Sequence, residues 1–255
     1  MVWVDKGVFI DPDIIKQLKK HSGKLVHFTP DPAFAYHRSK LFYQAIGFYD
    51  FCITTKSFEL EHYRQYGVKT IFCTQGYDPQ LHRPWNSFNE KKGVVFIGHN
   101  EGDREVAVAG LIESGVQVTI AGNDWEKLAQ KYKHNRLLIY KGKGVFGDAY
   151  AKELSGALIG LGFLSKWIPE LHTTRTIEIP ACNTALVTER NKEISSMFAD
   201  DEAIFYNQTR DLVEKVNYYL SKPAVLKEIA EKGYQKVING EYSYFEIMQN
   251  VVRQI

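Results

Sequence analysis

The stretch ALIGLGFLSKWIPELHTTRTIEIPAC, residues 157–182, decides the fold because it contains a strand, a loop and a helix start in succession. Its first six residues are apolar or glycine, which is typical of a strand buried on both faces of a parallel sheet. Three threonines then surround Arg175 where a helix should begin, and threonine is a competent helix N-cap. A strand followed by a helix in this way predicts an α/β fold.

The same alternation of apolar runs and amphipathic segments continues in both directions along the chain. It predicts four strands at residues 2–4, 24–29, 51–54 and 70–74, and six more at 93–98, 117–121, 137–140, 157–162, 185–188 and 203–206. Helices are predicted at residues 210–220, 223–238 and 242–255. Because the apolar positions of the last helix need a second surface to cover them, we expect it to return to the first series of strands.

The stretch at residues 76–89 is dense in Pro, Asn, Gly and Asp, and it interrupts both periodicities. It predicts a linker with a boundary near residue 88. We therefore expect two Rossmann-like domains, an incomplete one over residues 1–88 and a complete one with six strands over residues 89–255.

Composition excludes several classes of protein. The chain has 255 residues, with 32 Lys and Arg against 30 acids, so its net charge of +2 gives no footprint for nucleic acid. No apolar run reaches the length of a membrane helix, and no signal peptide is visible, so we expect a cytoplasmic protein with at most peripheral membrane contact. The three cysteines lie in apolar surroundings, which favours buried thiols over disulfides or zinc ligands: Cys52, Cys73 and Cys182.

Residues 170–182 carry the most informative chemistry. Free N–H groups at a helix start bind a diphosphate, and Thr174, Arg175 and Thr176 stand at that start. The guanidinium of Arg175 would add a bidentate contact to the phosphates. Glu178, one turn inside the helix, is placed to accept hydrogen bonds from a ribose diol, and Glu170 could reach the sugar.

These residues resemble a known family. ELHTTRTIEIPAC resembles the E-x7-E element of GT-B glycosyltransferases, and RTIEIPACNTALVTE resembles the spore-maturation-type branch of the glycosyl transferases group 1 superfamily. The segments GYDPQLHRP, FIGHNEGDRE and DAYAKELSGALIGLGF resemble other parts of these enzymes, so that the resemblance runs from about Leu25 to the C-terminus.

The resemblance implies roles for the two acids and the two domains. Glu178, as the second acid, would hold the ribose of the donor nucleotide, and Glu170 would contact the transferred sugar as a catalytic residue. Residues 1–88 would be the acceptor side, and residues 89–255 would bind the nucleotide sugar. It also implies a hexosyl- or related transferase that retains anomeric configuration.

Three residues depart from the family pattern. His82 replaces the usual Phe of G-x-D-x-x-x-F-x-P, and Asn183 stands where many relatives carry Gly. Pro180 falls where a helix interior resists proline, so the helix should be short or kinked. The alternative that Glu170 and Glu178 are ordinary solvated acids stays open.

Two further loops are candidates for donor binding. Gly98 and Arg104 belong to a turn after a strand that could approach a phosphate, and Lys141 and Lys143 belong to the glycine loop KGKGVFG that could frame the base or diphosphate. A mobile glycine loop is the alternative. The turn lacks the G-x-G-x-x-G spacing of a dinucleotide site, which disfavours an NAD-dependent oxidoreductase.

In the first domain, Asp31 follows a strand directly and would lie at the carboxyl end of the sheet, where α/β proteins bind ligands. It could position or deprotonate an acceptor hydroxyl, with His37 as a second candidate. A turn acid between two prolines is the alternative.

The amino-terminal charges have simpler interpretations. Asp11-Pro12-Asp13 matches a D-x-D metal motif superficially, but its order predicts a helix start without metal. A basic helix face could touch anionic lipid, although a solvated face is the favoured interpretation: Lys16, Lys19, Lys20 and Lys24.

Together these features predict a metal-independent glycosyltransferase that takes a nucleoside diphosphate sugar as donor substrate, without a cofactor. The acceptor is unknown, with a cell-surface glycan or a protein as candidates, and nucleic acid is not a partner. Two alternatives remain: a non-catalytic nucleotide-sugar-binding or assembly module, and a GT-B-shaped sugar-nucleotide epimerase.

Overall fold

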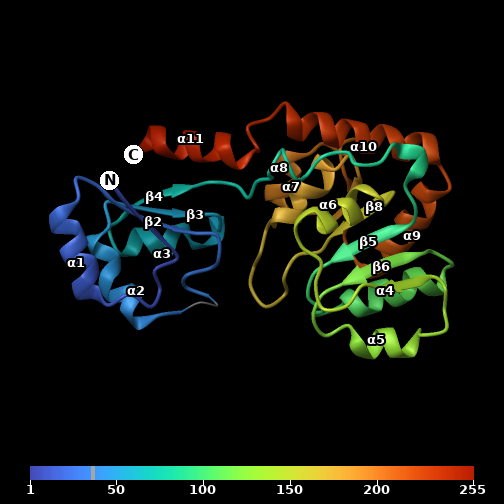
Figure 1. Ribbon diagram of the computed structural model, residues 1–255, viewed down its shortest axis with the longest axis horizontal. Coiled ribbons are helices and arrows are strands. Elements are labelled where there is room, and N and C mark those ends of the chain that lie inside the picture. Colours follow the sequence, from blue (N-terminus) through green and yellow to red (C-terminus); the bar gives the residue numbers. More distant parts are fainter. Residues whose placement is uncertain (36–37) are drawn as a thin grey trace. The chain divides into compact units, whose positions relative to one another are not determined.

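The computed structural model describes residues 1–35 and 38–255 (Figure 1). The chain forms two compact units. The first comprises Met1–Gln75, Trp167–Glu170 and Tyr244–Ile255, and the second comprises Gly76–Lys166 and Leu171–Ser243. The units therefore change over at the start of the 76–89 stretch in which the sequence predicts a linker, and two later segments of the chain belong to the first unit.

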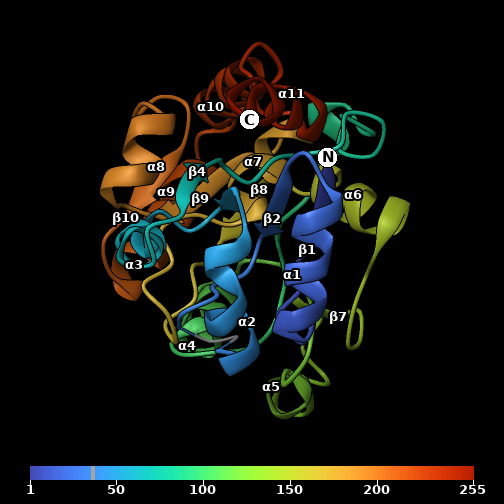
Figure 2. The same ribbon diagram turned by 90° about the vertical axis from the view of Figure 1, so that its left-hand side faces the viewer.

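The first unit is built on a four-stranded parallel sheet in the order β1-β2-β3-β4. Its strands lie at the predicted positions: β1 (Val2–Asp5), β2 (Leu25–Thr29), β3 (Phe51–Thr54) and β4 (Lys69–Phe72). Its helices, visible around this sheet in Figure 2, are α1 (Pro12–His21), α2 (Lys40–Ala45), α3 (Leu60–Gln65) and α11 (Tyr244–Gln254). Short 3₁₀ turns occupy Ile46–Phe48 and Ser57–Glu59.

Successive residues of each strand point to opposite faces of this sheet, and each face has its own core. Leu25 and Cys52 pack with α1, α2 and α3 on one face. Val26 and Ile53 pack on the other face with Ile247 and Val251 of α11. The expectation that the last helix returns to the first series of strands is thus confirmed.

Helix α1 begins as its sequence predicts. The Asp11 carboxylate accepts a hydrogen bond from the Asp13 N–H at 2.8 Å, and Pro12 occupies the first turn. On the basic face of this helix, Lys19 forms an ion pair with Asp50. The acid-Pro-acid motif is therefore a helix cap.

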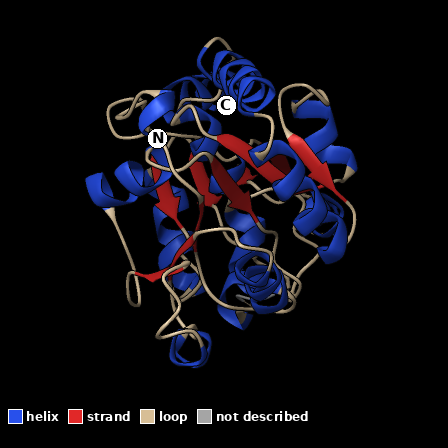
Figure 3. Cartoon of the chain, turned by 90° about the vertical axis from the view of Figure 1, so that its right-hand side faces the viewer, coloured by secondary structure: helices blue, strands red, loops and turns tan. Residues whose placement is uncertain are grey.

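The second unit has a six-stranded parallel sheet in the order β10-β9-β8-β5-β6-β7. Figure 3 shows strands in red with helices in blue around them. All six strands were predicted: β5 (Val94–Ile97), β6 (Val118–Ala121), β7 (Leu138–Tyr140), β8 (Ile159–Gly162), β9 (Ala185–Glu189) and β10 (Ile204–Tyr206). The strand order reverses between β5 and β8, and in such sheets ligands bind beyond the carboxyl ends of the strands at this switch point.

Helices cover both faces of this sheet. They are α4 (Arg104–Glu113), α5 (Glu126–Lys131), α6 (Gly147–Ser155), α7 (Thr174–Ala181), α8 (Lys192–Met197), α9 (Thr209–Leu220) and α10 (Pro223–Ile238), with a 3₁₀ turn at Phe88–Glu90. Helix α4 packs against α9, whereas α7 packs against α10 and β9. Each face of the sheet packs against its own helices, and the two faces form separate apolar cores.

Helix α7 ends at Ala181, directly after Pro180, which confirms that the helix is short. Asn183 follows with φ 53°, in the left-handed region that glycine and asparagine tolerate best. Asn183 thus adopts the left-handed backbone conformation that a glycine would also adopt at this position.

The three cysteines are buried and form no disulfide, as predicted. Among the described residues, none of the helices combines the length and apolar character needed to cross a bilayer.

Candidate functional site

Two hydrogen bonds between Thr173 and Thr176 fix the start of α7. Thr173 is the N-cap, and its backbone N–H donates to the Thr176 hydroxyl at 3.1 Å. The Thr176 side chain is fully buried, so it stabilises the helix start from within the protein and does not line the cavity described next. Thr174 and Arg175 remain partly exposed at the first turn, where unpaired N–H groups carry positive partial charge.

A cavity of about 480 Å³ opens at this helix start, within the second unit. This volume lies in the range of small-molecule sites. Its walls come from the loops after β5, β6 and β7, from α6 and α7, and from Leu81 and His82. The cavity therefore lies beyond the carboxyl ends of the strands, beside the switch point.

Two glycines let the loops after β5 and β6 approach closely. A Cβ on Gly122 would lie 2.0 Å from the Gly98 carbonyl oxygen, and Gly122 has φ 137°. Only glycine fits such a contact and conformation. Gly98 and Gly122 both line the cavity.

Glu178 lies in the cavity wall with 8% of its surface exposed. The Tyr150 hydroxyl donates to its Oε2 at 2.5 Å. Nε2 of His82 lies 3.6 Å from its Oε1. The carboxylate is thus flanked by two side chains from other segments of the chain.

Burial decides the protonation of both neighbours. It lowers the pKa of His82, although the nearby Glu178 and Asp78 carboxylates act in the opposite direction. It raises the pKa of Tyr150 well above its usual value, and Glu178 adds to the rise. Near neutral pH, Glu178 therefore faces an uncharged imidazole and an intact phenol.

Arg175 brings positive charge to the same cavity. Its Nη1 donates to the Ile97 carbonyl oxygen at 3.3 Å, and the guanidinium lies 5.6 Å from the Phe96 ring centroid. Its buried Nε has no hydrogen-bond partner among the described residues. A guanidinium beside free helix N–H groups can bind an anion such as a diphosphate.

The loop after β7 forms the outer wall. Phe146 is 83% exposed there, next to Gly147 with φ 56°. Lys143 lies in the same wall and pairs loosely with Glu126 at 3.8 Å. An exposed aromatic ring beside a cavity offers a flat surface for a ligand ring.

The remaining donor-binding candidates lie outside this cavity. Lys141 pairs with Glu153 at 2.8 Å. Arg104 is buried, and its guanidinium donates to the carbonyl oxygens of His99 at 2.7 Å and Leu164 at 3.0 Å. The structure thus gives Arg104 a role in fixing loops.

The two catalytic candidates belong to the first unit. Glu170 forms a 2.8 Å ion pair with Lys56, and the side chains are 13% and 6% exposed. Asp31 follows β2 and forms an ion pair with Lys6. His37 lies outside the described residues.

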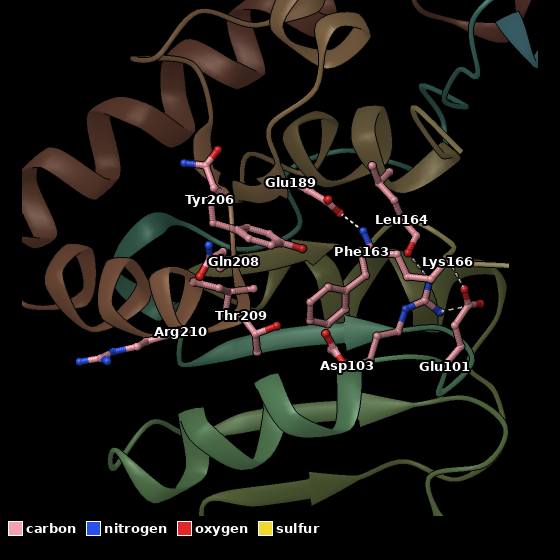
Figure 4. Close-up of a pocket in the computed structure, with 13 residues that line it drawn as sticks. Glu101, Asp103, Phe163, Leu164, Lys166, Glu189, Tyr206, Gln208, Thr209 and Arg210 are labelled. Carbon is pink, nitrogen blue, oxygen red and sulfur yellow. Dashed lines mark hydrogen bonds and ion pairs between the residues drawn. The ribbon is translucent and has the colours of Figure 1, made fainter. Parts of the chain in front are cut away.

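A second cavity of about 450 Å³ lies at the same sheet edge, on the side of α4 and α9 (Figure 4). Its charged groups compensate one another, since Lys166 pairs with Glu189 and Arg104 lies 3.6 Å from Glu101. The cavity at α7 therefore suits an anionic ligand better.

Tyr150, Phe146 and His82 are among the side chains of the α7 cavity that the sequence did not predict. Tyr150 lies on the helix after the glycine loop, Phe146 lies within that loop, and His82 was noted only as a departure from a pattern. An aromatic residue between glycines was a usable signal for Phe146. Contacts between distant segments, such as that of Tyr150 with Glu178, leave no such signal.

The fold is shared with solved structures. Sucrose-phosphate synthase from Thermosynechococcus elongatus superposes with a TM-score of 0.67 at 17% identity, over 95% of this chain and 71% of that one. Anabaena HepE in complex with UDP gives a TM-score of 0.72 at 12% identity, over 95% of this chain and 76% of that one. HepE in complex with UDP-glucose gives 0.70 at 12% identity, over the same shares.

At this identity the likeness shows the fold, which is the GT-B arrangement of two Rossmann-like sheets. No curated protein matches the chain. A family model described as "Glycosyl transferase-like" matches residues 104–253, which include α7 and most of the cavity wall. The chain therefore belongs to the glycosyl transferase-like family.

Proposed function

We propose that the chain transfers a glycosyl group from a nucleoside diphosphate sugar to an acceptor hydroxyl. The observation that carries the proposal is the α7 cavity, where Arg175 and a helix start face the same space as Glu178. A diphosphate and a ribose are the two parts of such a donor that need these groups. The UDP and UDP-glucose complexes of HepE support the choice of ligand class.

The donor can be assigned part by part. The diphosphate would lie at Thr174 and Arg175, and the ribose diol would donate to Glu178. The base would lie against the loop that carries Lys143 and Phe146. In this assignment, residues 89–255 and His82 bind the donor.

The reaction exchanges one C–O bond for another. The bond between the anomeric carbon and the β-phosphate oxygen breaks, and the acceptor oxygen bonds to the anomeric carbon while it loses its proton. The leaving diphosphate takes up negative charge, which Arg175 and the α7 start would stabilise without a metal ion. We also propose that the reaction retains anomeric configuration, as the spore-maturation-type E-x7-E resemblance implies.

The first unit would supply the acceptor side. Glu170 would contact the transferred sugar, and Asp31 would position the acceptor hydroxyl or accept its proton. Both carboxylates form an ion pair with a lysine, so each has a positive charge beside it.

The test is donor turnover by the whole chain. UDP-, GDP- and ADP-sugars would be incubated with mono- and oligosaccharide acceptors, and release of nucleoside diphosphate would be followed with and without EDTA. We expect release that depends on the acceptor and survives EDTA, with product of unchanged anomeric configuration by NMR. Donor consumption without acceptor would indicate an epimerase instead, and binding without any turnover would indicate a non-catalytic module.

A further inference from the structure

The Glu178 carboxylate is held by two side chains that the proposed reaction does not use. We propose that His82 and Tyr150 are positioning residues, which orient Glu178 so that the cavity selects ribose over 2′-deoxyribose. The inference rests on the proposed function, because it takes Glu178 as the ribose contact.

The orientation of His82 is fixed by its own turn. The Asp78 backbone N–H donates to Nδ1 of His82 at 3.1 Å, and the His82 N–H donates to the Asp78 carbonyl oxygen at 2.8 Å. Because Nδ1 accepts a hydrogen bond, the proton of the neutral ring must be on Nε2. That N–H lies on the side of Glu178, at 3.6 Å between the heavy atoms.

Tyr150 approaches the other carboxylate oxygen. Its hydroxyl lies 2.5 Å from Oε2 of Glu178, and its ring meets the His82 ring edge-on with centroids 5.8 Å apart. The three side chains come from the segment after β4, from α6 and from α7. Each oxygen of Glu178 thus has one neighbour within the protein and keeps lone pairs for a ligand.

Two fixed neighbours restrict rotation of the carboxylate. A ribose diol offers two adjacent hydroxyl donors, so it gains most from a carboxylate whose two oxygens are already in place. A 2′-deoxyribose offers only one of these donors and gains less. The family pattern has phenylalanine at the position of His82. A phenylalanine could fill the same space but could not donate a hydrogen bond.

The experiment compares ribonucleotide and deoxyribonucleotide affinity. Calorimetry on the whole chain would first identify the tightest ligand among UDP, GDP and ADP, and then measure this ligand and its 2′-deoxy analogue with each variant. The variants are Tyr150→Phe and His82→Phe, with His82→Gln as a variant that keeps a donor. Tyr132→Phe is the matched control, since the Tyr132 hydroxyl donates to Glu113 at 2.5 Å outside the cavity lining.

We expect the wild-type protein to prefer the ribonucleotide about tenfold or more, the effect of one charge-assisted hydrogen bond. Tyr150→Phe and His82→Phe should each reduce this preference about fivefold while hardly changing the deoxynucleotide affinity. His82→Gln should restore part of the preference, and Tyr132→Phe should leave it unchanged. In a Glu178→Gln background, neither substitution should have a further effect on the preference.

Equal weakening of both nucleotides, or a preference that survives in both variants, would overturn the inference and leave the proposed function standing. If the wild-type protein bound none of these nucleotides, the proposed function would be wrong and the inference with it. His82→Phe and Tyr150→Phe each keep an aromatic ring in the cavity wall, so we expect both variants to fold. Thermal unfolding of each variant checks this and separates loss of the fold from loss of Glu178 orientation.

Discussion

Glu170 and Glu178 are separated by only seven residues in the sequence, yet they belong to different compact units. Glu178 lines a cavity, accepts a hydrogen bond from Tyr150 and lies 3.6 Å from Nε2 of the uncharged His82. Glu170 is neutralised by the nearly buried Lys56 in the first unit. Acids of the same type thus have different electrostatic surroundings, which indicates different tasks.

The contrast extends to the energetics of each acid. A nearly buried ion pair is costly to break, because the remaining charge has lost its partner and its water. A carboxylate that faces neutral groups and lines a cavity can accept hydrogen bonds from a ligand. The first arrangement suits a fixed electrostatic element, and the second suits a binding group.

The largest effect should come from breaking the Lys56–Glu170 pair. Lys56→Met leaves the Glu170 carboxylate without its cation and should destabilise the first unit by about 3 kcal/mol. Lys56→Met combined with Glu170→Gln should recover most of this loss. Hydrogen exchange of the β3 amides measures the stability of this unit directly.

The matched control is Lys227→Met, which breaks an ion pair with Glu231 whose side chains are both 51% exposed. Solvent screens such a pair, so its loss should change little. If Lys56→Met were equally harmless, the buried pair would not be a fixed element of the first unit.

A second prediction tests whether acid weakens the first unit. Burial lowers the pKa of His27 from 6.5 to about 4. Between these values the unfolded chain takes up a proton that the folded unit does not, so stability should fall as pH drops through this window, by about 3 kcal/mol in total. Denaturation between pH 7 and pH 4 would show it, and His27→Gln should flatten the pH dependence. An unchanged slope in that variant would contradict the assignment.

The third prediction concerns the anion-binding end of the α7 cavity. Arg175→Ala should weaken binding of UDP by about 2 kcal/mol, roughly thirtyfold, because a charge-assisted contact to the diphosphate is lost. Uridine, which has no diphosphate, should bind equally well to both proteins. Arg210→Ala, in the lining of the second cavity, is the control and should bind UDP normally. Equal losses for UDP and uridine would place the diphosphate elsewhere.

The smallest effect is expected at the exposed ring of the glycine loop. Phe146→Ala should weaken UDP and uridine alike by about 1 kcal/mol, the lower range of base stacking on an aromatic side chain. Pyrophosphate binding should be unaffected. Phe245→Ala removes another exposed ring, 71% exposed on α11, and should change neither ligand.

The fold was predictable because most of the strands are buried on both faces. Such strands appear as short apolar runs, and all ten lie where these runs occur. The start of α7 was also predictable, because its N-cap Thr173 and the first residues of the helix are adjacent in the sequence.

Contacts between distant segments were not predictable. Lys56 is 114 positions from Glu170, and Tyr150 is 28 positions from Glu178. No local pattern records which side chains meet across such separations. Arg104 is a further example. Its position in a turn after a strand suggested a phosphate contact, but the turn did not reveal that its guanidinium donates to the carbonyl oxygens of His99 and Leu164.

The central claim is that Glu178 binds the donor nucleotide and Glu170 does not. Calorimetry with UDP and UDP-glucose on Glu178→Gln and Glu170→Gln tests it most directly. Glu178→Gln should weaken both ligands by roughly 1.5 to 3 kcal/mol, about tenfold to a hundredfold, whereas Glu170→Gln should leave UDP affinity nearly unchanged. If both folded variants bound UDP as tightly as the wild-type protein, Glu178 would not be the ribose contact and the donor site would not be at α7.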